Sequence, residues 1–214
     1  MRTAYQKIHR SSLNAGFSLL EMLVALTVFT IAIFISTGML LTLSQAQEHA
    51  TAFQNLQDNM RFALDSMGKS ILVGKNYRCF AAPLADPPGF AITDANANGD
   101  LDGLEIADNC NFGSGVSTFA YQSFPTPTYP LGRLIVYQMS GNKIMRSVNN
   151  GNFVAVTDPL LEVDRLLFYA TGPAANDQYQ PKVTILIHAF LPVRQGSPID
   201  LNLETTVSQR RIDT

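Results

Sequence analysis

Charged side chains are absent from a long stretch near the start of the chain. No Asp, Glu, Lys, Arg or His occurs between Met22 and Gln47. A helix crosses the hydrocarbon core of a bilayer with about 20 mostly apolar residues, so this stretch is long enough to span a membrane once. Basic residues stand before it at positions 2, 7 and 10, and no acid precedes Glu21. This asymmetry predicts a cytoplasmic N-terminus and a body on the outer side of the membrane.

Proline is absent before Pro83, so no proline interrupts a helix that begins at Phe17. Beyond Ser44, apolar residues recur at spacings of three and four with polar residues between them, which indicates an amphipathic helix. These apolar positions are Phe53, Leu56, Met60, Ala63, Leu64, Met67 and Ile71. We expect one helix over residues 17–74, with 17–43 transmembrane, 44–74 amphipathic, and Gly74 as its stop. A helix from Phe17 to Val73 would be about 85 Å long.

Motifs typical of enzymes are also missing, since no GxSxG, GxGxxG or P-loop occurs. The three histidines are His9, His49 and His188. His188 lies inside the apolar run Ile185–Leu191, and we expect a hydrogen-bonded sheet histidine there rather than a catalytic base. The sequence therefore predicts no catalytic site and no enzyme.

A broad basic surface is lacking as well. The net charge is −2, and removing residues 1–16 takes away three of the 15 basic side chains and no acid. The remainder has 12 Lys and Arg against 17 Asp and Glu, a net charge of −5. Nucleic-acid binding needs clustered Lys and Arg, and Arg210-Arg211 is too small a cluster. No nucleic-acid partner is expected.

Cysteine occurs twice, at Cys79 and Cys110, both on the predicted outer side. In an oxidising compartment a single pair favours a disulfide, and closing such a loop stabilises a fold by about 3–4 kcal/mol in the chain-entropy model. Two free thiols or half of a metal site are the alternatives. No CxxC spacing or nearby His supports a metal.

Glu21 stands at the start of the apolar run, where an ionisable group is costly and calls for a partner. A cleavage after Gly16 would create an amine on Phe17, and that cation could pair with Glu21 of the same chain or of a neighbour. The stretch Gly16-Phe17-Ser18-Leu19-Leu20-Glu21, followed by an apolar helix, resembles the class III signal of type IV pilins and type II secretion pseudopilins. A plain signal anchor with an incidental Glu is the alternative.

The resemblance implies three roles for these residues. A prepilin peptidase would cut after Gly16 on the cytoplasmic side and N-methylate Phe17, and Glu21 would be the family's carboxylate at mature position five. It also implies a type IV pilin fold of the α+β class, in which a long N-terminal helix packs against an antiparallel sheet. Residues 1–16 would then be a leader peptide.

The remainder, residues 75–214, is expected to form a β-rich head. Residues 75–115 are rich in Pro, Asp, Asn and Gly and predict a loop, closed by the bond between Cys79 and Cys110. After it come strand-like runs with hairpin-turn residues between some of them. The runs are Val116–Phe124, Arg133–Ser140, Lys143–Val148, Phe153–Val156, Val163–Tyr169, Lys182–Val193 and Leu201–Gln209.

One stretch inside that loop fits a calcium-binding pattern, D-x-[DN]-x-[DN]-G-x₅-E. Its candidate ligands are Asp94, Asn96, Asn98, Asp100, Asp102 and Glu105. Short oxygen-bearing side chains at alternate positions converge on one point. Asp100 would bind through its backbone carbonyl, so only three carboxylates contribute and a modest affinity of about 10⁻⁴–10⁻³ M is expected. The alternative is an Asn/Asp/Gly turn that leads into a strand near Leu104. No helix is predicted before it.

The head resembles minor pilins of the PilW/PulJ type, and so does the helix segment QDNMRFALD at 57–65. The resembling head segments are Leu134–Tyr137, Lys143–Arg146, Pro159–Val163, Leu167–Tyr169 and Leu203–Val207. The likeness implies a minor type IV pilin, a structural subunit that helps to initiate pilus assembly. A PulJ-like pseudopilin of a type II secretion system is the alternative. A membrane-anchored, calcium-dependent adhesin is a third hypothesis, with Tyr121, Phe124 and Tyr129 as its candidate surface residues.

The implied partners are a prepilin peptidase, other minor and major pilins or pseudopilins, and an inner-membrane assembly platform. The implied location is the bacterial inner membrane, with a single pass and the head in the periplasm, followed by a pilus or pseudopilus filament. Apart from calcium, no cofactor is expected.

Overall fold

The computed structural model describes residues 16–90, 101, 104, 110, 115–172, 180–193 and 197–210. The chain divides into two compact units, Met1–Glu48 and His49–Thr214. A single helix, α1 (Leu19–Leu72), runs through both in sequence. The long helix predicted from the absence of charge and proline is confirmed, and Gly38 does not interrupt it.

The end of α1 is fixed by contacts from the residues that follow it. The Gly74 amide donates to the Ile71 carbonyl at 2.8 Å, and the buried Tyr77 hydroxyl donates to the same oxygen at 2.7 Å. These bonds satisfy a carbonyl that the last helical turn leaves without a partner. A Cβ on Gly74 would lie 2.4 Å from the Tyr121 ring, so only glycine fits at this turn.

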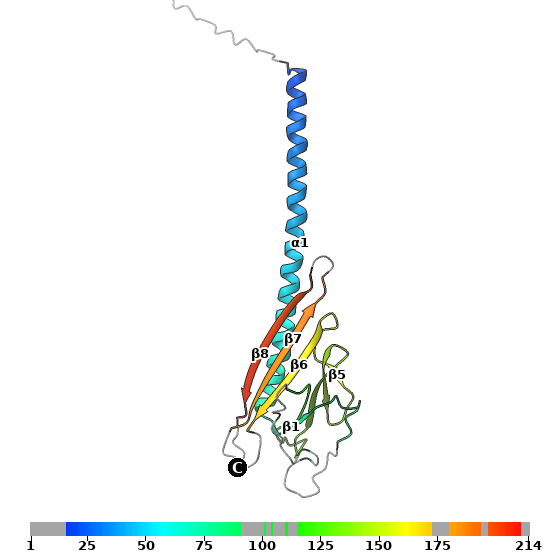
Figure 1. Ribbon diagram of the computed structural model, residues 1–214, viewed down its shortest axis with the longest axis vertical. Helices are drawn as coiled ribbons and strands as arrows, with labels where there is room; N and C mark the ends of the chain where they lie inside the picture. The colour runs from blue at the N-terminus through cyan, green and yellow to red at the C-terminus, as the bar shows by residue number, and fades with distance from the viewer. Residues whose placement is uncertain are drawn as a thin grey trace, which may run out of the picture. The chain divides into compact units, whose positions relative to one another are not determined.

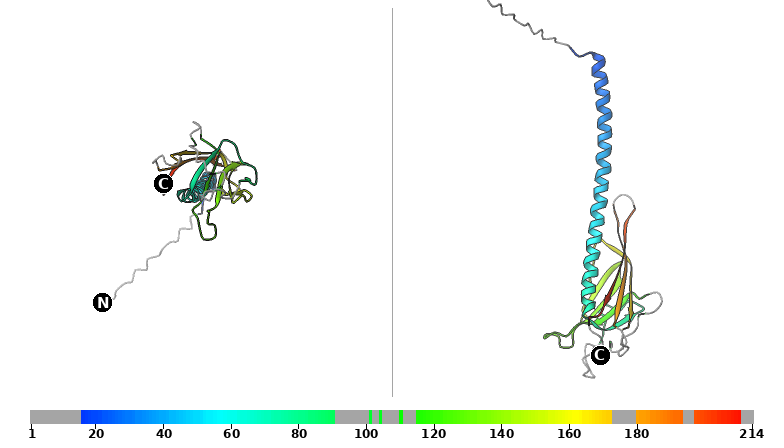
Figure 2. Two further views of the ribbon diagram at one scale, coloured as in Figure 1. Left: turned by 90° about the horizontal axis from the view of Figure 1, so that it is seen from below. Right: turned by 90° about the vertical axis from the view of Figure 1, so that its left-hand side faces the viewer.

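The described residues of the second unit form eight strands in two antiparallel sheets, and Figures 1 and 2 show them beside the C-terminal part of α1. The five-stranded sheet has the order β1-β2-β3-β4-β5 and the three-stranded sheet the order β6-β7-β8. The bounds are β1 (Lys75–Phe80), β2 (Thr118–Gln122), β3 (Leu134–Ser140), β4 (Lys143–Val148), β5 (Val154–Ala155), β6 (Glu162–Thr171), β7 (Lys182–Leu191) and β8 (Ile199–Ser208). The expected helix-on-antiparallel-sheet architecture is confirmed.

β1 corrects the prediction that the chain becomes irregular from Lys75. This strand pairs with β2, and its register shifts between Lys75 and Arg78. Asn76, which lies inside that shift, has a φ of 55°, a left-handed conformation that asparagine tolerates better than most residues. Only Tyr77 and Cys79 of the strand are buried, so its alternation was too short to stand out.

The main core joins one face of α1 to the inner faces of both sheets. Five helix residues are buried in it, namely Leu56, Met60, Ala63, Met67 and Ile71. Across the core, the Phe119 ring of β2 stacks on the Phe168 ring of β6 with centroids 5.1 Å apart. Phe53 was expected on this face but is 42% exposed, because it lies before the first buried residue of the helix. Leu64 is partly buried.

A second, smaller core covers the other face of the five-stranded sheet. Its buried members are Leu101, Leu104, Ala120, Leu134, Val136 and Phe153. The Leu101 amide donates to the Gln122 side chain at 3.0 Å, and the Leu84 amide donates to the Gln138 side chain at 2.8 Å. The described residues between β1 and β2 thus include several that pack onto the sheet, although the prediction treated the segment only as a loop.

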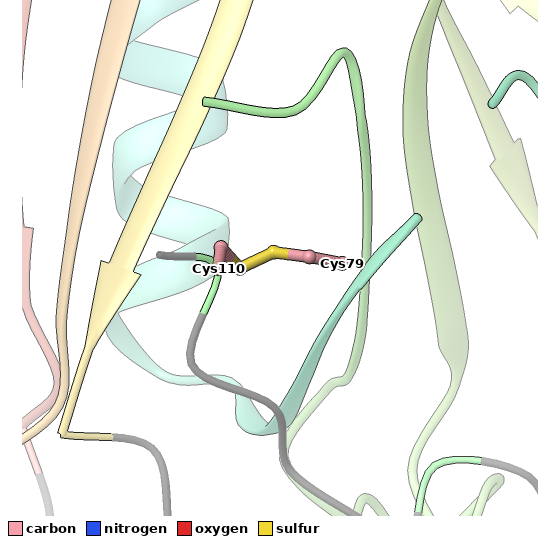
Figure 3. The surroundings of a disulfide bond; sticks show 2 residues. All are labelled: Cys79 and Cys110. Carbon is pink, nitrogen blue, oxygen red and sulfur yellow. A yellow bond between two sulfur atoms is a disulfide. The ribbon is translucent and has the colours of Figure 1, made fainter. Parts of the chain in front are cut away.

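The two cysteines form a disulfide that ties β1 to this same segment, with Cα atoms 5.5 Å apart (Figure 3). The Cys110 amide also donates to the Ala170 carbonyl of β6 at 3.1 Å. One residue therefore connects the five-stranded sheet, through its sulfur, with the three-stranded sheet, through its backbone.

Candidate assembly site

The first residues of α1 and the three described residues before them are exposed, and the helix hydrogen bonds begin at the residue before the helix. Residues 16–18 are non-helical and exposed. The Ser18 carbonyl accepts the Met22 amide at 3.2 Å, which places Ser18 in the position of a helix N-cap. The Phe17 side chain is 78% exposed, and a Cβ on Gly16 would meet nothing within 4 Å. The two residues that flank the Gly16–Phe17 peptide bond are therefore both exposed.

Glu21 lies in the first turn of α1, four residues after Phe17. Its carboxylate is favourably placed there, because the N-terminus of a helix carries partial positive charge. The side chain is exposed, and within the part of the chain that the structure describes its carboxylate has no ion-pair partner. The site thus holds one carboxylate that is available to a cation from outside.

The surface that follows Glu21 is apolar on every side. Large apolar side chains from Phe17 to Leu43 are between 48% and 86% exposed. The side-chain hydroxyls among them donate to the helix's own backbone, as Thr27 does to Val24 and Thr30 to Thr27, both at 2.8 Å. Ser36 does the same to Ala32 at 2.8 Å. Satisfied hydroxyls lower the cost of placing these residues in hydrocarbon.

α1 is long and apolar enough to cross a membrane, with a mean hydropathy of 2.4 in its most apolar window, near the N-terminus. A match to known proteins covers this same region and the residues before it. Residues 11–37 fit the family model described as the prokaryotic N-terminal methylation motif. The chain carries a class III pilin signal. Membrane anchoring of a pilin-like or pseudopilin precursor fits both the motif and the helix. No curated protein and no solved structure matches the chain.

The six candidate calcium ligands, Asp94, Asn96, Asn98, Asp100, Asp102 and Glu105, lie outside the described residues. Leu101 and Leu104, which stand among them in sequence, are described and are 1% and 0% exposed. Among the described residues, no group of three or more His, Cys, Asp and Glu is arranged to hold a metal ion. Leu104 itself lies outside the strands, and its amide donates to the Leu101 carbonyl at 3.0 Å.

His188 is bonded within the three-stranded sheet. Its Nδ1 lies 2.5 Å from Asp164 Oδ1 on β6, and its Nε2 lies 3.7 Å from Asp200 Oδ2 on β8. A register shift between Val163 and Arg165 marks a bulge at Asp164 and places that carboxylate beside the imidazole. Neither carboxylate partner was predictable from the sequence, because a bulge changes which residues share a face. The expectation of a hydrogen-bonded sheet histidine agrees with these contacts.

The three aromatic residues considered for an adhesive surface do not lie together on one. Tyr121 is fully buried, and its hydroxyl bonds to Ser70 Oγ on α1, so it takes no part in a surface patch. Burial and the neighbouring Tyr137 raise the pKa of Tyr121 well above its usual value. Phe124 is 53% exposed and Tyr129 41% exposed, with the Arg133 guanidinium 5.5 Å from the Tyr129 ring. Tyr121 lies on β2, whose residues are all buried, whereas Phe124 and Tyr129 lie in the connection between β2 and β3.

Proposed function

We propose that the chain is the precursor of a minor type IV pilin, a structural subunit that helps to initiate assembly of a pilus. The observation that carries the proposal is that one uninterrupted helix joins the N-terminal motif to the head. A methylation motif leads into an exposed apolar helix, and the same helix continues into a residue row that is buried under two antiparallel sheets. The apolar half of this helix could exchange lipid for neighbouring helices, while the head keeps its own fold.

Assembly would begin with cleavage after Gly16 by a prepilin peptidase, followed by methylation of Phe17. The new amine is a cation one helical turn before Glu21. In the apolar centre of a filament both charges would be costly if unpaired, so pairing between the Phe17 amine and the Glu21 carboxylate of a neighbouring subunit offsets their burial. Equivalent helices would then replace lipid around residues 19–43, while the head stays on the periplasmic side until the subunit leaves the inner membrane.

The N-terminus of the native protein tests the first step. Mass spectrometry of the protein isolated from its own cells should show a chain that starts with N-methylated Phe17. A chain that retains Met1, or starts elsewhere without a methyl group, would contradict cleavage and leave an ordinary anchored domain. A Gly16→Trp variant is the matched control, because it should remain uncleaved while α1 still inserts in the membrane.

A pseudopilin of a type II secretion system is the second candidate, since the same motif and helix occur in that class. The two differ in the partners they require. Deleting the gene should abolish surface pili if the chain is a minor pilin and should block protein secretion if it is a pseudopilin. Partner genes for retraction and alignment, or for a secretin and secretion components, would give the same answer independently.

Calcium binding by the 94–105 loop is a separate proposal. It is supported by the oxygen-rich spacing of the motif and by the two leucines inside it, which are buried against the five-stranded sheet. Those leucines hold the second half of the candidate stretch against the sheet at two positions. Calorimetry on the full chain in detergent should show calcium heat and a higher melting temperature with calcium than with magnesium. Asp94→Ala should remove both effects, and an unchanged response in that variant would contradict the proposal.

A further inference from the structure

The free edge of β8 differs from the other strand edges of the head. Edge strands offer unpaired backbone groups to any extended chain, and proteins guard them with short length, bulges, proline or charge. β8 is ten residues long and pairs with β7 over ten consecutive residues without a register shift. It is the last strand of its sheet, and its sequence IDLNLETTVS contains no proline, lysine or arginine.

The remaining edges are protected by short length, by bulges or by basic side chains, none of which β8 has. β1 is six residues long, is bulged, and bears Lys75 and Arg78. β5 has two residues. β6 contains the bulge at Asp164, and its Phe168 is bridged to Val116. Among the described strands, β8 therefore presents the longest regular edge, at the side of the three-stranded sheet away from β6 (Figure 1).

The two faces of β8 show what would fit beside it. Its inner-row side chains, which include Leu201, Leu203 and Val207, are half-buried, whereas the inner row of β7 is fully buried from Val183 to Ala189. The apolar layer under the sheet thus extends to the edge and is left partly uncovered there. The outer row carries two exposed carboxylates, Asp200 and Glu204. Glu204 has no ion-pair partner among the described residues.

These rows argue against pairing between two copies through β8. Such a pair would bring four carboxylates, two from each copy, onto one outer row with no Lys or Arg from either strand. Like charges on adjacent strands are destabilising, whereas opposite charges contribute favourably across a strand pair. The complementary occupant is an extended segment with apolar residues on one side and basic residues on the other.

We propose that β8 binds an extended segment of a different neighbouring subunit, which alternates apolar residues with Lys or Arg and adds a fourth strand to the three-stranded sheet. This is recognition by strand addition, in which backbone hydrogen bonds give affinity and alternate side chains give specificity. The inference rests on the proposed function, because it takes the occupant from a neighbouring subunit of the same assembly. It assigns a binding partner to the head, about which the N-terminal motif gives no information.

The test uses the full chain in neutral-detergent micelles and a fluorescent peptide of alternating Val and Lys, as long as β8. A peptide of the same composition with Val and Lys in separate blocks is the control ligand. Glu204→Lys should weaken binding of the alternating peptide about fivefold, the upper range for an exposed ion pair. Glu162→Lys, on the outer strand β6 of the same sheet, is the matched control and should bind as the unchanged chain does.

Hydrogen exchange gives a second measurement, because a general charge effect would not slow the exchange of β8 amides alone. Amides of β8 should exchange more slowly with the alternating peptide bound, while those of β1 should not change. Equal binding of the block peptide, equal weakening by Glu162→Lys, or unchanged exchange in β8 would each overturn the proposal. This assay needs no filament. If the peptide does not bind but mass spectrometry finds an N-methylated Phe17, only the β8 inference is rejected. If the peptide binds but the native protein retains its unprocessed N-terminus, the proposed function is rejected instead.

Discussion

The two halves of α1 are both regular α-helix, but their apolar side chains differ in burial. From Leu19 to Leu43 the large apolar side chains are exposed in the isolated chain, whereas from Leu56 to Ile71 one row is buried under the sheets. The first half can satisfy its side chains only with lipid or with other helices. The second half already has its partners. The difference indicates that one half of the helix is available for exchange and the other fixes the head.

Removing the charge of Glu21 should have the largest effect on the first half of the helix. Its carboxylate is the group that we propose pairs with the Phe17 amine of a neighbouring subunit, and lipid offers no such pairing. Glu21→Val is expected to abolish incorporation into filaments, while membrane insertion and the head's melting temperature stay unchanged. Counting filaments by electron microscopy and fractionating membranes would measure the two effects. Glu21→Asp keeps the charge and should restore partial incorporation, and full assembly of the Val variant would refute the pairing.

Truncating one apolar residue in each half should sharpen the contrast. Met60 is 0% exposed, and Met60→Ala should lower the free energy of unfolding of the head by about 2–5 kcal/mol through lost contacts and a cavity. Leu40 is 65% exposed, and Leu40→Ala should leave the head's unfolding midpoint unchanged. Thermal and urea unfolding of both full-length variants in detergent would compare them. Equal losses would mean that the first half also supports the fold.

Opening the disulfide should have a somewhat smaller effect confined to the second unit. The Cys79→Ser, Cys110→Ser double variant is expected to lose about 3 kcal/mol, because the reduced chain gains freedom when unfolded. The loss should appear as a lower urea midpoint of the head, with helix content from Leu19 to Leu43 retained. The unchanged chain measured under reducing conditions is the control, and its midpoint should fall to that of the double variant. A midpoint that stays put in both would contradict a stabilising role.

The sequence revealed the local features of the fold. Absence of charge and a spacing of three and four residues predicted α1 nearly to its ends, and strand-like runs bounded by turn residues predicted β3, β4 and β7 with small errors. The candidate site was equally local, since residues 16–21 are adjacent in the chain. Features set by distant pairing were not predictable. The bulge at Asp164, the exposure of Phe53 and the burial of Leu101 all depend on which segments meet in space.

The smallest expected effect concerns a polar contact between α1 and the sheet. Tyr121 on β2 bonds to Ser70 of α1, so Tyr121→Phe should cost about 1 kcal/mol of stability at neutral pH. Tyr129 is half-exposed, and Tyr129→Phe is the control that should cost nothing measurable. Urea unfolding would rank the two variants. An equal midpoint for both would mean that the bond between Tyr121 and Ser70 contributes nothing measurable to stability.

The same contact should make the head sensitive to alkali. Burial raises the pKa of Tyr121 well above 10.0 and also raises that of Tyr137, so the folded head holds these protons more tightly than the unfolded chain does. Stability from this source is complete below about pH 10 and falls as the pH rises above it, because the unfolded state then releases protons that the folded state keeps. Tyr121→Phe should therefore show a shallower decline of the urea midpoint between pH 9 and 11 than the unchanged chain does. An unchanged slope would place the alkali-sensitive group elsewhere. Helix content in the first half should not respond in either protein, because no ionisable side chain occurs between Met22 and Gln47.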